Sequence, residues 1–230
     1  MLMKEKNKIL ALDVNQISRK AYSLKEEIAS SITHGIGILF SIVTLTILLI
    51  YAIWDKSPIS IVAFSIYGAC SICLYTSSTL YHSFQNQKIK KILRVFDHSS
   101  IFLFIAGTYT PVALLSMTGY WRIGILSAVW TIALIGIGFK IFTYNKFDKF
   151  KMISVLMYVL MGWIVIIAIK PMLQMVPKGF FIWLLAGGII YTLGTIFYSI
   201  KKIPYNHAIW HLFVLGGSVM HFLGIFIYLK

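Results

Sequence analysis

The segment SITHGIGILFSIVTLTILLIYAIW, residues 31–54, decides the class of this protein. It holds no Asp, Glu, Lys or Arg, and it exceeds the roughly 20 residues that an α-helix needs to cross the hydrocarbon core of a bilayer. Hydrocarbon offers no partner to free backbone N–H and C=O groups, which a helix satisfies internally. The segment therefore predicts a transmembrane helix.

Six further apolar runs follow, at about residues 58–83, 97–117, 120–140, 152–170, 180–199 and 207–229. They are long and do not alternate between apolar and polar residues, which favours helices over strands. Pro111 lies inside the third run and predicts a kink there. We expect an all-α membrane protein, a seven-transmembrane-helix bundle over residues 26–230, with residues 1–25 as a cytoplasmic N-terminal segment.

The composition indicates that a membrane is the solvent of this chain. Of the 230 residues, 59% are hydrophobic and 12% are charged, and the mean hydropathy is +0.83. A soluble domain of this length could not bury so much apolar surface. The formal net charge of +14 would suggest nucleic acid in a soluble protein, but no basic stripe with interleaved aromatic residues stands outside the apolar runs. We therefore expect membrane lipids, and no nucleic acid, as partners.

The lysines and arginines are distributed unevenly between the two sides of the predicted bundle. Sixteen of the 21 lie in the N-terminal segment or in the connections after the second, fourth and sixth runs. The positive-inside rule then places the N-terminus in the cytoplasm and the C-terminus outside, opposite to the arrangement of G-protein-coupled receptors. Residues 1–25 are polar and lack the apolar core of a cleavable signal peptide. We expect a multi-pass protein of the plasma membrane.

Five of the six histidines fall at run ends that this orientation places at the cytoplasmic face. Carboxylates and a hydroxyl from distant segments reach the same depth. Such side chains are costly within a membrane and usually mark a functional site. The residues that share this depth are Glu26, Glu27, His34, Ser78, His82, Asp97, His98, His207 and His211.

His207 and His211 are four residues apart, so their imidazoles lie on one face of a helix. A helix commonly offers two nitrogen ligands to zinc at this spacing, and His82 at the end of the second run supplies a third candidate. Three neutral histidines and a water molecule form the open tetrahedral arrangement of a catalytic zinc site. Asp97 could hydrogen-bond that water or orient a histidine. The sequence therefore predicts a zinc site made by His82, His207 and His211.

Each of these residues also has a simpler interpretation. Asp97 is well placed to cap the third helix at its N-terminus, His82 could extend towards the lipid head groups, and His98 could face them. For any single residue the simpler interpretation is the better one. For the three histidines and Asp97 together at one depth, the metal site is favoured.

Glu27, His34 and His221 can also be placed relative to the predicted site. Glu27 and His34 are expected to line the same cavity or to brace it. His221 lies ten residues beyond His211, about 15 Å further along a helix. That is too deep for the same ion, so we expect His221 to form a hydrogen bond between helices.

Several short motifs together resemble the hemolysin III family, the bacterial branch of the progestin and adipoQ receptor superfamily. The resemblance spans nearly all of residues 24–230, and it is specific because the motifs occur in this order on seven apolar runs. They are Glu26-Glu27 followed by Thr33-His34-Gly35, Ser78 with His82, Phe96-Asp97-His98-Ser99, and His207 with His211 followed by His221-Phe222.

The resemblance implies a zinc site on the cytoplasmic side. In the related adiponectin receptors, one histidine of the second span and two of the seventh hold zinc, and these match His82, His207 and His211. A serine and an aspartate near the zinc-bound water match Ser78 and Asp97. The superfamily includes alkaline ceramidases, so the resemblance suggests hydrolysis of lipid amides.

Three functions follow as alternatives. The first is zinc-dependent hydrolysis of a lipid amide or ester, with Asp97 as general base and Ser78 as hydrogen-bond donor. The second is a membrane-lytic or pore-forming hemolysin, although a pore needs a polar path across the whole bilayer and the polar residues here gather at one end. The third is a sensor or regulator of membrane state in which zinc braces the helices without turnover. The first is favoured.

Overall fold

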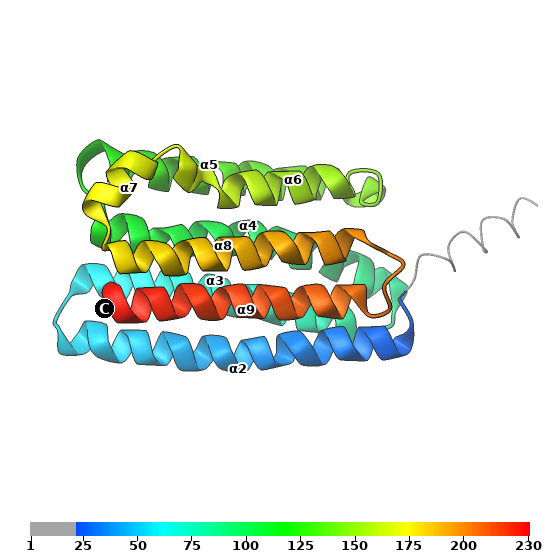
Figure 1. Cartoon of the computed structure of the whole chain (residues 1–230). Coiled ribbons are helices and arrows are strands. Elements are labelled where there is room, and N and C mark those ends of the chain that lie inside the picture. Colours follow the sequence, from blue (N-terminus) through cyan, green and yellow to red (C-terminus); the bar gives the residue numbers. More distant parts are fainter. Residues whose placement is uncertain (1–21) are drawn as a thin grey trace, which may run out of the picture.

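A bundle of long helices makes up residues 22–230, the part of the chain that the computed structural model describes (Figure 1). No strand occurs among these residues, so this part of the chain is all-helical, and its long apolar helices make the chain a multi-pass membrane protein. Residues 1–21 of the expected N-terminal segment lie outside the described part. Within that part, six helices are each long and apolar enough to cross a membrane: α2 (Leu24–Trp54), α3 (Pro58–Ser83), α4 (Gln87–Ser116), α5 (Gly119–Phe142), α8 (Lys178–Ser199) and α9 (Asn206–Tyr228).

The fifth expected span, residues 152–170, is a broken helix with a bend of 55° rather than a continuous one. Tyr109 of α4 stabilises the break, because its hydroxyl donates to the Gly162 carbonyl at 2.6 Å and accepts from the Val165 N–H at 3.2 Å. A neighbouring side chain thus supplies partners to backbone groups at the interruption. Counted as one span, the broken helix brings the number of spans to as many as seven in the described residues. Its pieces are α6 (Lys151–Gly162), the short 3₁₀ helix η2 (Ile164–Ile166) and α7 (Ile169–Met175).

Two helices begin earlier than the apolar runs predicted, because polar first turns precede the apolar segments. α2 starts at Leu24 rather than at residue 31, and Ser23 caps it in a reciprocal pair with Glu26. α4 starts at Gln87 rather than at residue 97, and the Asn86 side chain accepts from N–H groups of its first turn. Both caps lie at the same end of the bundle (Figure 1).

Asp97 therefore lies well inside α4, and the simpler interpretation, that it caps this helix, was wrong. The cap is Asn86, and the helix has already made more than two turns when it reaches Asp97. From there on, most side chains of α4 as far as Ala113 are buried. The helix continues without interruption through Pro111.

Consecutive helices pack side by side from α2 to α5 and again from α8 to α9, and α2 also packs against α9 (Figure 1). The starts of α2, α4 and α9 and the end of α3 therefore meet at one end of the bundle. The polar residues that the sequence placed at one depth all belong to these four segments. In Figure 1, α5, α6 and α7 form a layer on the side away from α2.

Gly37 allows a close approach of α2 and α3 near this end. A Cβ atom on Gly37 would lie 2.2 Å from Cδ1 of Tyr75, a fully buried ring. Tyr75 also shares a 2.7 Å hydrogen bond with the Ser218 hydroxyl of α9, and its ring meets that of His34 edge-on. The glycine thus sets the spacing of three helices next to the predicted site.

We predict that Gly37→Ala lowers the melting temperature of the detergent-purified protein by roughly 3–10 °C, because overpacking a closed contact costs about 1–3 kcal/mol. Gly35→Ala is the matched control, since a Cβ atom there meets nothing within 4 Å and alanine favours the helix. Equal melting temperatures for the two variants, followed by intrinsic fluorescence, would contradict the close packing at Gly37.

Candidate metal centre

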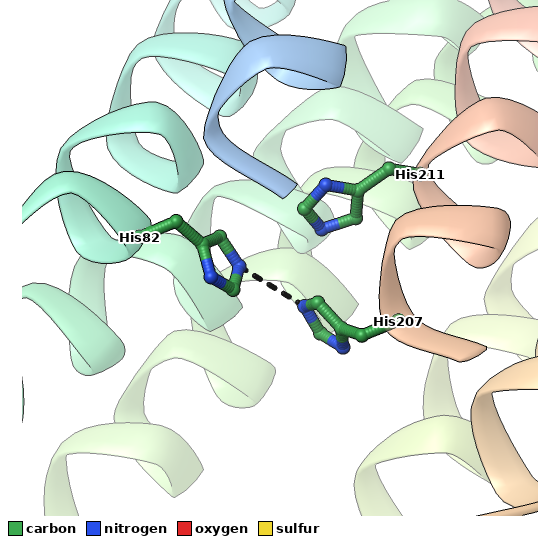
Figure 2. Close-up of side chains that lie close together, drawn as sticks. All are labelled: His82, His207 and His211. Atoms are coloured by element: carbon green, nitrogen blue, oxygen red, sulfur yellow. Dashed lines mark hydrogen bonds between the residues drawn. The ribbon is translucent and has the colours of Figure 1, made fainter. Parts of the chain in front are cut away.

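Three buried histidines point towards one another where α3 ends and α9 begins (Figure 2). His82 lies in the last turn of α3, and His207 and His211 lie in the first two turns of α9. Their exposed fractions are 1%, 3% and 0%. One ligand nitrogen from each ring lies within 4.8 Å of the others, and the Nε2 atoms of His82 and His207 are 3.0 Å apart. We call these three residues the histidine cluster.

Glu27 of α2 orients the first of these rings. Its Oε2 accepts a 2.6 Å hydrogen bond from Nδ1 of His82, and its Oε1 pairs with the ammonium of Lys90 at 2.8 Å. An ionised carboxylate can only accept, so the proton of His82 sits on Nδ1. The lone pair on Nε2 then faces the other two histidines. Carboxylates bonded to ligand histidines in this way are a regular feature of metal sites.

The other two rings are also held through Nδ1. His211 donates from Nδ1 to the Ser30 carbonyl at 3.1 Å, because a carbonyl oxygen can only accept. Nδ1 of His207 lies 3.3 Å from the Tyr22 hydroxyl. Side-chain and backbone groups near the start of α2 therefore engage the outer nitrogen of each ring and leave Nε2 directed inward.

This donor set fits a transition-metal ion. Neutral imidazole nitrogens suit zinc and other first-row transition metals, whereas calcium and magnesium prefer oxygen ligands. Nε2 of His211 is buried and has no hydrogen-bond partner among residues 22–230. An unpaired buried lone pair is costly, and a bound cation would remove that cost. The three histidines are thus close enough together, and suitably oriented, to bind a metal ion.

His34 lies against the histidine cluster without joining it. Its ring stacks on that of His211 with a centroid separation of 3.5 Å and an interplanar angle of 12°. The side chain is 1% exposed, and neither ring nitrogen has a hydrogen-bond partner in the described part of the chain. His34 is therefore a polar group available to a ligand.

Asp97 and His98 form a buried pair on α4. Nδ1 of His98 lies 3.1 Å from Oδ2 of Asp97, and Asp97 is 4% exposed. The ring of His98 packs edge-on against Phe147, and its backbone carbonyl accepts from the Tyr158 hydroxyl. The interpretation that His98 faces the head groups was wrong, because the long N-terminal extension of α4 carries this residue into the bundle.

Ser78 lies one turn before His82 on the same face of α3. It is 0% exposed, and its hydroxyl has no hydrogen-bond partner within residues 22–230. A buried hydroxyl of this kind is free to donate to a ligand near the cluster.

An apolar cavity of about 140 Å³ adjoins the cluster between α4, α6, α8 and α9. His34 and Asp97 line it at the polar end, and Trp163 and Leu184 line it near the broken span and the start of α8. His221 also lies on its wall and donates from Nε2 to the Leu184 carbonyl at 3.1 Å. The predicted hydrogen bond of His221 between helices is thereby confirmed.

Some partners of the histidine cluster give no signal in the sequence. Tyr22 precedes the first apolar run. Lys90 lies in a basic connection, where the sequence suggests a topology signal and not a site. The Ser30 oxygen belongs to the backbone, so no residue type marks it. Only the path of α2 past α3 and α9 brings these groups to the three rings.

Comparisons with known proteins find similar sequences over most of this chain. The sequence model of a family described as "Haemolysin-III related" matches residues 22–222. The chain is 46% identical over 213 residues to Hemolysin-3 of Bacillus cereus, which covers 93% of this chain and 96% of that protein. It is 48% identical over 207 residues to the Hemolysin-3 homolog of Bacillus subtilis (strain 168), covering 90% and 96%. It is 31% identical over 177 residues to the Monocyte to macrophage differentiation factor of Homo sapiens, covering 71% and 69%.

We predict that His211→Ala abolishes stoichiometric metal binding and that Glu27→Gln weakens the metal affinity by roughly 10–100-fold, because the orienting carboxylate is lost. Metal content of the detergent-purified protein by mass spectrometry, followed by chelator competition, measures both effects. His221→Gln is the control: it alters a half-buried histidine on α9 that lies away from the cluster. Full metal occupancy in His211→Ala would refute the site.

Proposed function

This chain belongs to the haemolysin-III related family, and from that premise we propose that it is a zinc-dependent membrane hydrolase that cleaves an amide or ester bond of a lipid. The observation that carries the proposal is the junction of the histidine cluster with the apolar cavity. His34 lines the cavity and stacks on His211, so the polar and apolar parts are in contact. A lipid offers the same combination, an apolar chain ending in a carbonyl group.

The cavity wall suits an acyl chain. It is lined mainly by aliphatic and aromatic side chains such as Leu74, Ile101, Phe104 and Val214. Ligand sites typically combine such a lining with a few polar groups that fix the reacting bond. Asp97 is the carboxylate on this wall, so the reacting carbonyl would lie at its end of the cavity.

The residues of the site divide the proposed chemistry between them. His82, His207 and His211 would hold the zinc ion, which when bound supplies a Lewis acid that polarises a carbonyl and acidifies water. The carboxylate of Asp97 takes a proton from the attacking water and returns it to the leaving nitrogen or oxygen as the carbonyl–heteroatom bond breaks. The hydroxyl of Ser78 donates a hydrogen bond to the carbonyl oxygen as it becomes negative. The superfamily that the sequence resembles includes alkaline ceramidases, and this supports the reaction class.

Membrane lysis is a second candidate, because the two bacterial relatives carry the name Hemolysin-3. A pore needs polar groups along the whole thickness of the bilayer. Among the described residues, Glu27, Asp97 and the histidine cluster gather at one end of the bundle, and the cavity beyond them is apolar. This distribution supports the hydrolase over the pore. A sensor that holds the metal without turnover would use the same ligands.

The proposed site lies at the cytoplasmic face of the plasma membrane, with the N-terminus inside and the C-terminus outside. Sixteen of the 21 lysines and arginines lie on the side of the chain that carries the histidine cluster, and the positive-inside rule assigns this side to the cytoplasm.

We predict that alkaline phosphatase fused after Lys230 is active in a bacterial host and that the same enzyme fused after Asn86 is inactive, since it folds only outside the cytoplasm. Activity assays on whole cells with matched expression levels measure this. The reverse pattern would overturn the proposed orientation.

We predict that the metal-loaded protein releases fatty acid from at least one member of a panel of lipid amides and esters, measured by mass spectrometry. Asp97→Asn should lower the rate by about 10²–10⁴-fold and Ser78→Ala by about 10²-fold, both with the metal retained. Ser83→Ala, an exposed serine of α3, is the control for Ser78.

Two outcomes would contradict the hydrolase. Full metal occupancy without turnover of any lipid would favour the sensor. Discrete single-channel currents that Asp97→Asn leaves unchanged would favour the pore.

A further inference from the structure

A second, smaller cavity lies beside His98. It measures about 20 Å³, and three cationic side chains line it, one from each of three helices. They are Arg94 of α4, Lys140 of α5 and Lys151 of α6. The sequence offered these residues only as topology signals, and the proposed hydrolysis does not use them.

Lys140 is the least expected of the three. It is 1% exposed, and its ammonium donates to the Ser154 hydroxyl at 2.5 Å. The rings of Phe147 and Tyr158 lie 4.8 Å and 5.9 Å from its Nζ. Among residues 22–230 no carboxylate lies within ion-pair distance of it. A buried ammonium with one neutral oxygen partner lacks the counter-charge that such groups normally require.

The neighbouring cations add to the uncompensated positive charge around Lys140. The guanidinium of Arg94 lies 4.8 Å from the Phe147 ring that Lys140 also contacts. Arg94 pairs at 2.8 Å with Asp148, whose side chain is 56% exposed. Like charges gathered around a small buried space repel one another strongly, because the local dielectric constant is low.

Lys151 and His98 complete the lining. The ammonium of Lys151 lies 3.6 Å from the Tyr198 ring and donates to the Tyr198 carbonyl at 3.4 Å. His98 contributes a ring whose Nδ1 is already engaged by Asp97. Asp148 pairs with Arg94, and Asp97 pairs with His98. Lys140 and Lys151 are therefore left without an anionic partner in the described part of the chain.

We propose that this cavity binds a phosphate group. A phosphate matches the fork of Arg94 and the two ammonium groups, because it accepts several charge-assisted hydrogen bonds at once. The volume admits one or two oxygen atoms and excludes an acyl chain, since one water-sized sphere alone occupies about 10–15 Å³. The phosphate thus enters oxygen-first, with its ester linkage directed outward.

The position of the cavity agrees with this ligand. It lies at the end of the bundle where α5 ends and α6 begins, the same end as the histidine cluster (Figure 1). Because that end meets the membrane surface, the phosphate of a lipid head group and free phosphate from solution are both present there. Phosphate binding at this site does not require turnover at the histidine cluster, so it can be tested independently of the proposed hydrolase.

The test is a binding titration of the full-length protein in maltoside micelles, followed by intrinsic fluorescence and melting temperature. Trp210 lies on the walls of both this cavity and the apolar cavity, so the lysine variants described below assign the signal to this site. The probes are dioleoylphosphatidic acid, dioleoylglycerol as the same lipid without phosphate, and inorganic phosphate. We expect phosphatidic acid to bind at least about 10-fold more tightly than dioleoylglycerol. Competition by millimolar inorganic phosphate would identify free phosphate as a ligand, and its absence would identify the lipid head group.

Lys140→Met should weaken binding of phosphatidic acid by about 10–100-fold while preserving the apolar stem of the side chain. Lys151→Gln, at a half-buried position, should act in the same direction and serves if the first variant does not fold. Lys146→Gln is the matched control, because it removes one exposed charge from the same connection. Equal binding of the two lipids, or equal losses in Lys140→Met and Lys146→Gln, would overturn the proposal.

Discussion

Hydrocarbon provides no hydrogen-bond partner, so each imidazole of the histidine cluster must find one within the protein. α2 supplies most of these partners. It supplies the Glu27 carboxylate to His82, the Ser30 carbonyl to His211 and the ring of His34 that stacks on His211. The inward direction of the three Nε2 atoms is a consequence of these outer contacts. The candidate metal centre is therefore built as much by the first helix as by the two helices that carry its ligands.

Much of the architecture could be read from the sequence, because hydrocarbon imposes a simple length requirement on each crossing. The ends of α3 and α8 agree with their apolar runs, and the spacing of His207 and His211 gave their shared face. Residue depth, estimated from these runs, also predicted that the polar residues meet at one end. The polar first turns of α2 and α4 were not predicted, because a count of apolar residues cannot detect a polar turn that a cap stabilises.

Features that depend on contacts between distant segments could not be predicted. The break in the fifth span lies in an uninterrupted apolar stretch and is stabilised by Tyr109, more than fifty residues earlier. Lys140 ends the fourth apolar run, and its burial follows from the way the connection after α5 folds back over it. The apolar cavity likewise has no local signal, because its walls come from helices spread along the chain from α2 to α9.

The interrupted backbone of the fifth span also bears on how a guest molecule could reach the interior. A continuous helix resists local displacement, because its ladder of hydrogen bonds must stretch along the whole length. Between Gly162 and Ile169 that ladder is already divided, and the Tyr109 hydroxyl spans the gap. Trp163 and Val165 of this stretch line the cavity. Ile166 and Ile167 of the same stretch face outward. A small outward displacement of this stretch would thus open the cavity sideways to the lipid, so that a molecule dissolved in the bilayer could enter without first passing through water.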